Sequence, residues 1–273
     1  MFNFIDQWGS IVSMQKNNIE LACGLIGIGR TWGFKETAIP TEEEALRFLD
    51  SALAQSIGYY DTAPSYALSE ERMGKWLKTL TSKQRAEITV ATKFGEHWST
   101  TEQKPYVDHH YEVLTASLDQ SIQRLGQIDV LQLHKTNPEV LKSDDLKRAW
   151  DYARQKGINR FGASVSDLRS AEIAVEDDQY ELIQLPFNQK NTTFTPIIEE
   201  ATKRGKNIVT NRPFNMGEIV NSDGESRSRA KLEQDAFEFI LRQFFNGFVL
   251  TGTKSPEHLR ENIIAFNKAK SLI

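Results

Sequence analysis

The sequence contains a single cysteine, Cys23, among its 273 residues. One cysteine cannot form an internal disulfide, which fits a reducing compartment, and we expect Cys23 to be a small buried apolar residue. Long apolar runs are also missing, because the longest, LACGLIGIG, is far too short to span a bilayer. The N-terminal MFNFIDQWGS lacks the cationic start, apolar centre and cleavage site of a secretory signal. We therefore expect a soluble, cytoplasmic protein.

The chain has no excess of basic residues. Its 33 Lys and Arg residues stand against 37 Asp and Glu residues, which gives a net charge of −4 at pH 7. Binding to the phosphates of nucleic acid requires a basic face, so nucleic acid is not an expected partner. Residues with metal-ligand spacing are also missing. The adjacent His109 and His110 would point in different directions at the start of a helix, and we expect no metal site.

No linker rich in proline, serine or glycine divides the chain, so residues 1–273 are expected to form one domain. Eight short apolar or β-branched runs predict strands at residues 25–29, 57–61, 88–93, 130–134, 160–165, 182–188, 208–211 and 248–252. Between them, apolar residues at helical spacing predict helices at residues 41–55, 108–125, 143–157 and 256–270. The pair Thr41 and Glu44 forms a capping box, and Gly126 is a typical stop signal.

Strands that alternate with helices predict right-handed βαβ units and a parallel sheet. Eight such units close into a barrel, so the expected fold class is α/β, a (β/α)8 TIM barrel in a single domain. The first twenty residues are expected to form a short N-terminal appendage, a hairpin that covers the barrel floor. The polar segment 212–229 is either disordered or a lid over a ligand, and the sequence leaves both interpretations open.

Four titratable residues fall at the ends of consecutive predicted strands. Asp61 and Tyr66 lie in GYYDTAPSYALSEE, Lys93 lies in ATKFG, and His134 lies in LQLHK. Taken singly, such a lysine is usually a solvated strand end, and such a histidine is usually a hydrogen-bonded bystander. The C-terminal ends of barrel strands meet at one face, however, so the four side chains are expected to come together there as a site.

This group of side chains suits the protonation of a carbonyl oxygen. A tyrosine with a pKa of about 10 is a poor acid at neutral pH. An adjacent ammonium favours its phenolate, and a carboxylate can hold that ammonium in place. We therefore expect Tyr66 to be the acid, Lys93 its electrostatic partner, Asp61 the anchor of Lys93, and His134 the residue that orients the carbonyl. Since no side chain supplies a hydride, the reaction requires a nicotinamide cofactor.

The segments DTAPSYALSEERMG, ATKFG, LQLHK and GTKSPEHLRENI together resemble the aldo-keto reductase family, over essentially the whole chain. The resemblance implies a (β/α)8 barrel that binds NADPH, less often NADH, and interconverts carbonyls and alcohols. It also implies that Asp61, Tyr66, Lys93 and His134 are the catalytic tetrad.

Cofactor contacts follow from the same resemblance. It implies that they are made by Gly29, Arg30, Thr31, Ser164, Gln184, Asn211, Phe214, Gly252, Thr253, Lys254, His258, Glu261 and Asn262. The sequence departs from the family pattern at three of these positions. Val165 follows Ser164 where many members have asparagine, Asn211 replaces an aromatic residue that stacks on the nicotinamide, and His258 replaces a phosphate-binding arginine. Lys254 lies beside a helix N-terminus, a ready anion site, so we expect NADP(H) to be preferred over NAD(H).

Trp32, Phe94 and Trp98 follow strand ends and are expected to line a substrate pocket, although a core role for one or two of them is an equal alternative. The expected partner is a small carbonyl or sugar substrate, and the expected assembly is a monomer or small homo-oligomer. Two other functions stay open. One is a non-catalytic, cofactor-binding regulatory protein on the same barrel. The other is a different barrel enzyme, such as an isomerase or an aldolase that acts on a sugar phosphate. In an aldolase Lys93 would form a Schiff base, and Asp61 and Tyr66 would have no obvious purpose.

Overall fold

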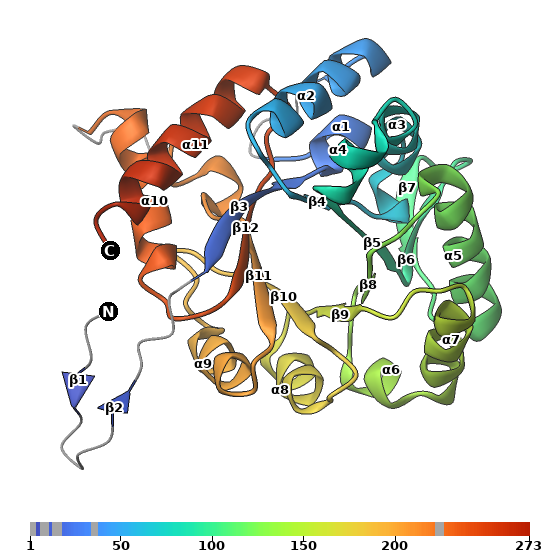
Figure 1. The fold of residues 1–273 in the computed structure, drawn as a ribbon. Coiled ribbons are helices and arrows are strands. Elements are labelled where there is room, and N and C mark those ends of the chain that lie inside the picture. The colour runs from blue at the N-terminus through green and yellow to red at the C-terminus, as the bar shows by residue number, and fades with distance from the viewer. Residues whose placement is uncertain (1–3, 6–10, 13–17, 34–37, 222–226) are drawn as a thin grey trace.

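Eight parallel strands close into a barrel in this computed structural model, which describes residues 4–5, 11–12, 18–33, 38–221 and 227–273. Figure 1 looks along the barrel, with the strands in the centre and the helices outside. Around the barrel the strands are β3 (Ile19–Gly24), β4 (Tyr59–Asp61), β5 (Thr89–Phe94), β8 (Val130–Leu133), β9 (Phe161–Ser164), β10 (Leu182–Pro186), β11 (Asn207–Asn211) and β12 (Gly247–Thr251). Strand β12 pairs with β3 to close the ring. The predicted (β/α)8 fold is confirmed.

Helices follow the strands in chain order and cover the outside of the barrel (Figure 1). The longer ones are α2 (Glu42–Ala54), α3 (Ser69–Leu77), α5 (Tyr111–Leu125), α7 (Asp144–Gln155), α8 (Leu168–Glu176), α9 (Thr195–Lys203), α10 (Arg229–Leu241) and α11 (Pro256–Lys270). The short ones are α1 (Ile26–Gly29), η1 (Pro64–Tyr66), α4 (Ser82–Ala86), α6 (Pro138–Lys142) and η2 (Asn215–Gly217). Among the helices that the structure describes, none is long and apolar enough to cross a membrane.

Several helices begin or end at the capping residues that the sequence predicted. Thr41 and Glu44 form a reciprocal capping box, in which each side chain accepts a hydrogen bond from the backbone N–H of the other. Gly126 ends α5 with a positive φ of 78°, a conformation that glycine adopts without strain. Helix α11 begins at Pro256, directly after the N-cap residue Ser255.

The first barrel strand does not lie where the sequence predicted it. The strand is Ile19–Gly24, and most of the predicted strand 25–29 is instead the single helical turn α1. A short apolar run has no periodicity that separates strand from helix, so the pattern LIGIG was ambiguous. The remaining seven predicted strands each overlap a barrel strand.

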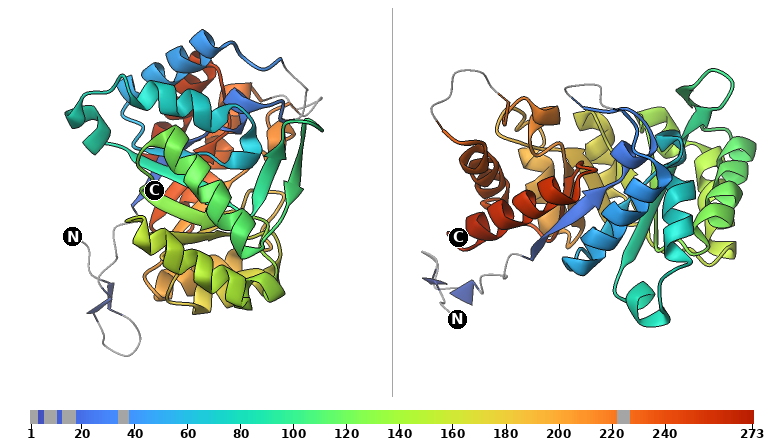
Figure 2. Two further views of the ribbon diagram at one scale, coloured as in Figure 1. Left: turned by 90° about the vertical axis from the view of Figure 1, so that its right-hand side faces the viewer. Right: turned by 90° about the horizontal axis from the view of Figure 1, so that it is seen from above.

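Two hairpins accompany the barrel among the residues that the structure describes. At the N-terminus, β1 (Phe4–Ile5) pairs antiparallel with β2 (Ile11–Val12), as predicted. Figures 1 and 2 show this hairpin standing away from the barrel, so it does not cover the floor. The second hairpin pairs β6 (Glu96–Ser99) with β7 (Lys104–Val107) directly after β5, and it therefore belongs to the face where the strands end.

The interior of the barrel is built in two layers because side chains two residues apart on a strand share a face. The lower layer is a buried cluster that includes Tyr59, Ala91, Val130, Leu182 and Val209. Two residues further along the same five strands stand Asp61, Lys93, Gln132, Gln184 and Asn211. The packing layer below thus supports a polar layer at the C-terminal ends of the strands, where barrel active sites lie.

Candidate active site

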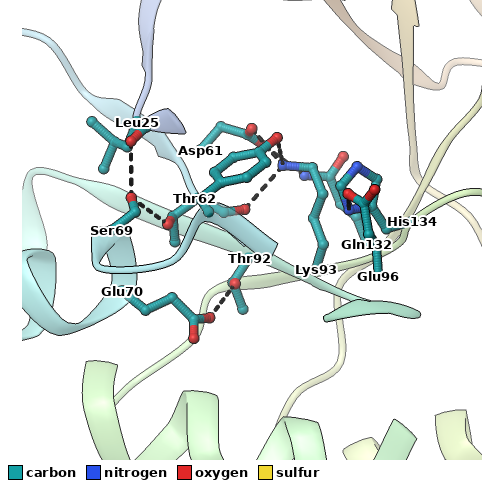
Figure 3. A network of polar contacts seen from close by, with 11 residues as sticks. Leu25, Asp61, Thr62, Ser69, Glu70, Thr92, Lys93, Glu96, Gln132 and His134 are labelled. Carbon is teal, nitrogen blue, oxygen red and sulfur yellow. Dashed lines mark hydrogen bonds and ion pairs between the residues drawn. The ribbon is translucent and has the colours of Figure 1, made fainter. Parts of the chain in front are cut away.

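Lys93 is the centre of the polar layer and is almost completely buried, with 1% of its surface exposed. Its ammonium donates to Oδ2 of Asp61 at 2.5 Å, to the carbonyl oxygen of Thr62 at 2.9 Å and to the hydroxyl of Tyr66 at 3.4 Å. Figure 3 shows this network at the ends of β4 and β5. An ammonium has three donors, so all of them are satisfied.

The carboxylate of Asp61 is fixed from two sides. Gln132 donates to its second oxygen, Oδ1, at 2.8 Å, while Oδ2 accepts from Lys93 (Figure 3). Burial alone would lower the pKa of Lys93, but the charge of Asp61 and the contact with Tyr66 outweigh burial and raise it. Lys93 therefore remains an ammonium, which is unsuited to the nucleophilic attack that a Schiff-base aldolase requires.

Tyr66 ends the short helix η1 and faces the cavity from the loop after β4. Burial raises the pKa of its hydroxyl above the ordinary value of 10, and the positive charge of Lys93 works in the opposite direction. Lys93 therefore lowers the pKa of the phenol as expected, but burial raises this pKa by more. As a result, Tyr66 carries its proton at neutral pH, and Lys93 stands ready to stabilise the phenolate that proton loss would leave.

His134 lies next to Tyr66, with the two rings edge to face at a centroid distance of 6.1 Å. Burial, followed by the positive charges of Lys93, Lys135 and Arg30, holds the pKa of His134 well below its ordinary value of 6.5. Oε2 of Glu96 approaches Nδ1 of His134 at 3.3 Å, but this contact lacks the geometry of a hydrogen bond. The imidazole is thus neutral at physiological pH and is available to hydrogen-bond a ligand.

The depressed pKa of His134 predicts an acid-sensitive fold. The unfolded chain binds a proton at this histidine near pH 6.5 and the folded protein does not, so the free energy of unfolding should fall as the pH drops below that value. The expected slope is at most about 1.4 kcal/mol per pH unit. His134→Gln should flatten this slope in urea unfolding measured between about pH 7.5 and 5.

His110 provides the control for this experiment. It is exposed, and its hydrogen bond to Asp108 raises its pKa, so it favours the folded state at low pH and loses that effect as the pH rises. His110→Gln should therefore not flatten the acid slope. Equal flattening by both variants would show that the buried imidazole is not the cause.

A cavity of about 590 Å³ opens above the polar layer. Asp61, Tyr66 and His134 line it, while Lys93 lies behind them. The expected cofactor residues that also line it are Arg30, Ser164, Gln184, Asn211, Phe214, Gly252, Thr253, His258 and Asn262. The described part of the segment 212–229 contributes residues on both sides of its undescribed residues 222–226. The described residues of the segment therefore form part of the cavity wall.

Other expected cofactor residues lie elsewhere. Gly29 and Thr31 line a neighbouring pocket, Glu261 is exposed outside the cavity, and the ammonium of Lys254 donates to the carbonyl of Ala38. Packing explains why residue 29 is a glycine, because a Cβ at this position would come within 1.9 Å of the carbonyl oxygen of Tyr66. A glycine at this position lets α1 pack directly against the loop that carries Tyr66.

The three aromatic residues expected in the substrate pocket have different positions. Trp32 lines the cavity, and Trp98 lines the neighbouring pocket with its ring 5.6 Å from the guanidinium carbon of Arg30. Phe94 is fully buried in the core and packs against Trp150 at a centroid distance of 4.6 Å, so its assignment to the pocket was wrong. The alternation of a strand explains this, because its neighbour Lys93 points into the barrel and Phe94 must point out.

Several residues of the site were missed in the sequence. Gln132 holds Asp61, Glu96 contacts His134 and Lys135, and Gly24 and Ile26 line the cavity directly after the first strand. Gln132 had a readable signal, since it lies two residues before His134 on a strand and therefore shares its face. Within the described parts of the chain, His, Cys, Asp and Glu form no group of three or more that could hold a metal ion.

Comparisons with known proteins identify the family of the chain. Residues 20–226 match the model of the Aldo/keto reductase family. The uncharacterized oxidoreductase YqkF of Bacillus subtilis (strain 168) is 26% identical over 83% of this chain and 83% of its own length. A D-threo-aldose 1-dehydrogenase of Pseudomonas sp. is 28% identical over 71% of this chain and 67% of its own length. In fold, the chain is similar to a crystal structure from Pseudomonas aeruginosa described as an aldo-keto reductase. That match has a TM-score of 0.75 and 23% identity, and it covers 97% of this chain and 93% of the other.

Proposed function

The chain belongs to the aldo/keto reductase family and is an oxidoreductase, and from this premise we propose that it interconverts a small carbonyl compound and its alcohol with Tyr66 as the proton donor and acceptor. The observation that carries this proposal is the partly buried contact of the Tyr66 hydroxyl with the Lys93 ammonium, which Asp61 and Thr62 hold in place. It places a protonated phenol at the cavity with a cation ready to stabilise its anion.

In the direction of reduction, each side chain has a separate task. Tyr66 donates its proton to the carbonyl oxygen of the substrate, and the nearby Lys93 stabilises the phenolate that remains. The neutral His134 hydrogen-bonds the same oxygen and orients it toward Tyr66. Asp61 and Gln132 keep the Lys93 ammonium in position. A nicotinamide cofactor bound in the cavity would supply the hydride.

The cavity has features that fit a nicotinamide carboxamide. Oε1 of Gln184 and Oδ1 of Asn211 are buried acceptors without a hydrogen-bond partner in the described structure, and both residues line the cavity. A buried acceptor without a partner is costly, and a carboxamide NH₂ group could satisfy them. Ser164 lines the same wall and adds a hydroxyl. We infer that these three residues hold the nicotinamide end of the cofactor.

A substrate screen tests the proposed function. Oxidation of NADPH and NADH should be followed with aldehydes, ketones, aldoses and pyridoxal, and reduction of NADP⁺ and NAD⁺ with alcohols and sugars. Sugars are included because one relative is a D-threo-aldose 1-dehydrogenase. Turnover of simple aldehydes is the expected result. Tight cofactor binding with no turnover of any substrate would instead support a non-catalytic binding protein.

Lys254 is expected to favour NADP(H) over NAD(H). It directly precedes Ser255, the N-cap of α11, where a phosphate would also meet the positive end of a helix. To reach a 2′-phosphate, its ammonium must leave the carbonyl oxygen of Ala38. Lys254→Ala should weaken NADPH binding by about tenfold, the scale of one charged hydrogen bond, and change NADH binding little. Fluorescence titration of both cofactors measures this.

Lys268→Ala is the matched control, since it removes an exposed lysine from the last turn of the same helix. This variant should bind both cofactors like the wild type. An equal loss of affinity for NADPH and NADH in Lys254→Ala would show that Lys254 does not contact the 2′-phosphate.

A further inference from the structure

We propose that the natural substrate carries a carboxylate in addition to its reacting carbonyl, and that Arg30 is the residue that binds this carboxylate. The inference rests on the proposed function, because it specifies the substrate class of the same cavity. Arg30 follows α1 directly and lines the cavity together with Tyr66 and His134.

Aromatic rings hold the guanidinium of Arg30 in place. Its central carbon lies 5.7 Å from the ring centroid of Trp32, 5.6 Å from that of Trp98 and 6.0 Å from that of Tyr66. Cation–π contacts of this kind attract a guanidinium electrostatically. Unlike a carboxylate, the rings leave its full positive charge and the N–H groups of its fork free to bind an anion.

No carboxylate of the described residues pairs with Arg30, and its buried Nε has no hydrogen-bond partner among them. Of the other Lys and Arg residues that line the cavity, Arg212 also has no carboxylate partner among the described residues, but it follows β11, on the wall that we assign to the cofactor. The remaining two are already engaged. Lys135 lies 3.4 Å from Glu96, and Arg229 lies 2.8 Å from Glu233. Buried donors are normally satisfied, so the free Nε of Arg30 is the kind of group that a ligand completes.

The charges around Tyr66 favour an anion there despite two carboxylates in the cavity wall. Asp61 is paired with Lys93, and Glu96 is paired with Lys135. Arg30 therefore leaves an uncompensated positive charge at this end of the cavity, in a protein whose net charge is −4. Such a local charge selects an anionic substrate and guides it into the cleft.

The position of Arg30 points to the substrate and not to the cofactor. Its neighbours Tyr66 and Trp98 come from the segments after β4 and β5. The residues that fit the carboxamide, by contrast, belong to β9, β10 and β11. A single guanidinium fork also matches one carboxylate in charge and in geometry, with two parallel N–H···O bonds. The ligand group is therefore a carboxylate on the same molecule as the carbonyl that Tyr66 protonates.

Pairs of aldehydes that differ only in charge test the inference. Suitable pairs are 4-carboxybenzaldehyde with its methyl ester and succinic semialdehyde with its methyl ester. The wild type should prefer each acid in kcat/KM. Arg30→Gln should lower kcat/KM for the acids by about 10- to 100-fold more than for the esters. The preference of Arg30→Lys for the acids should lie between those of the wild type and Arg30→Gln, because lysine keeps the positive charge and lacks the two parallel N–H donors of the guanidinium.

Arg212→Gln is the matched control. The guanidinium of Arg212 also lies near the ring of Trp32, at 5.9 Å, and Arg212 lines the same cavity. This variant should leave the ratio of acid to ester nearly unchanged. If it lowers the ratio as much as Arg30→Gln does, the preference comes from the general field of the cavity, and the specific role of Arg30 is overturned. A parallel loss for acids and esters in Arg30→Gln would overturn it as well.

A binding measurement separates this inference from the proposed function. If none of the aldehydes is turned over, the proposed function fails, while carboxylate binding can still be tested by calorimetry. The wild type should bind 4-(hydroxymethyl)benzoate more tightly than its methyl ester, and Arg30→Gln should remove that difference. Equal affinity of the wild type for the two compounds would refute the carboxylate site whatever the catalytic result.

Discussion

Tyr66→Phe is expected to lower kcat for aldehyde reduction by about two to four orders of magnitude, the usual scale for loss of a general acid. The variant removes the hydroxyl that contacts Lys93 at 3.4 Å and keeps the ring that lines the cavity. Cofactor affinity should therefore change little, because the residues that we assign to the cofactor lie on other strands. Single-turnover kinetics with saturating cofactor, together with a cofactor titration, would measure both effects.

Tyr60→Phe is the control for this experiment because it makes the same chemical change one residue before Asp61 on β4. The side chain of Tyr60 points out of the barrel, packs against Trp76 at a centroid distance of 5.2 Å, and has a buried hydroxyl without a hydrogen-bond partner. Removing an unsatisfied buried hydroxyl should leave activity intact and stability equal or higher. Near-normal turnover by Tyr66→Phe at neutral pH would refute the assignment of Tyr66 as the acid.

Lys93→Met is expected to depress both activity and stability. The ion pair with Asp61 is almost fully buried, and removing one partner of such a pair costs about 3–5 kcal/mol because the other charge is left uncompensated. Activity should fall strongly, because Lys93 is the cation that contacts the Tyr66 hydroxyl. Asp61→Asn should reduce activity less, because the ammonium is still present and only its positioning is weakened.

The double variant Lys93→Met/Asp61→Asn separates the two effects. It removes both buried charges, so its free energy of unfolding should exceed that expected from adding the two single losses. Its activity should stay low, because the cation next to Tyr66 is still missing, and the two losses in kcat should not add. Guanidinium unfolding and steady-state kinetics provide the measurements. Fully additive losses in both would contradict a coupled network.

Lys206 offers a matched control for loss of a buried lysine. Its ammonium donates to the carbonyl oxygens of Asp177 and Tyr180, at 2.7 and 2.6 Å, and it directly precedes β11, at the opposite end of the barrel from the site. Lys206→Met should lower the free energy of unfolding, because the carbonyl oxygens of Asp177 and Tyr180 lose the hydrogen bonds from the ammonium. Its kcat should stay near the wild-type value at temperatures where the protein is folded. This comparison distinguishes a catalytic effect of Lys93→Met from general destabilisation.

The sequence by itself determined the alternation of strands and helices, and through it the barrel. The capping pair Thr41 and Glu44 and the stop at Gly126 were correct because such signals act within one helical turn and do not depend on distant packing. It also predicted that Asp61, Tyr66, Lys93 and His134 lie close together, because parallel strands bring their C-terminal ends to one face whatever the details of the helices.

Only the tertiary structure decided how each of these side chains is held. Gln132 reaches Asp61 across 71 positions of the sequence, and that contact depends on the register between neighbouring strands. The turn LIGIG became a helix and not a strand, and its Gly29 packs against the carbonyl oxygen of Tyr66. Burial outweighed the charge of Lys93 in setting the pKa of Tyr66, and burial is a property of the assembled barrel. Local patterns could not supply these outcomes, because each one arises from atoms that come together only when the ring of strands closes.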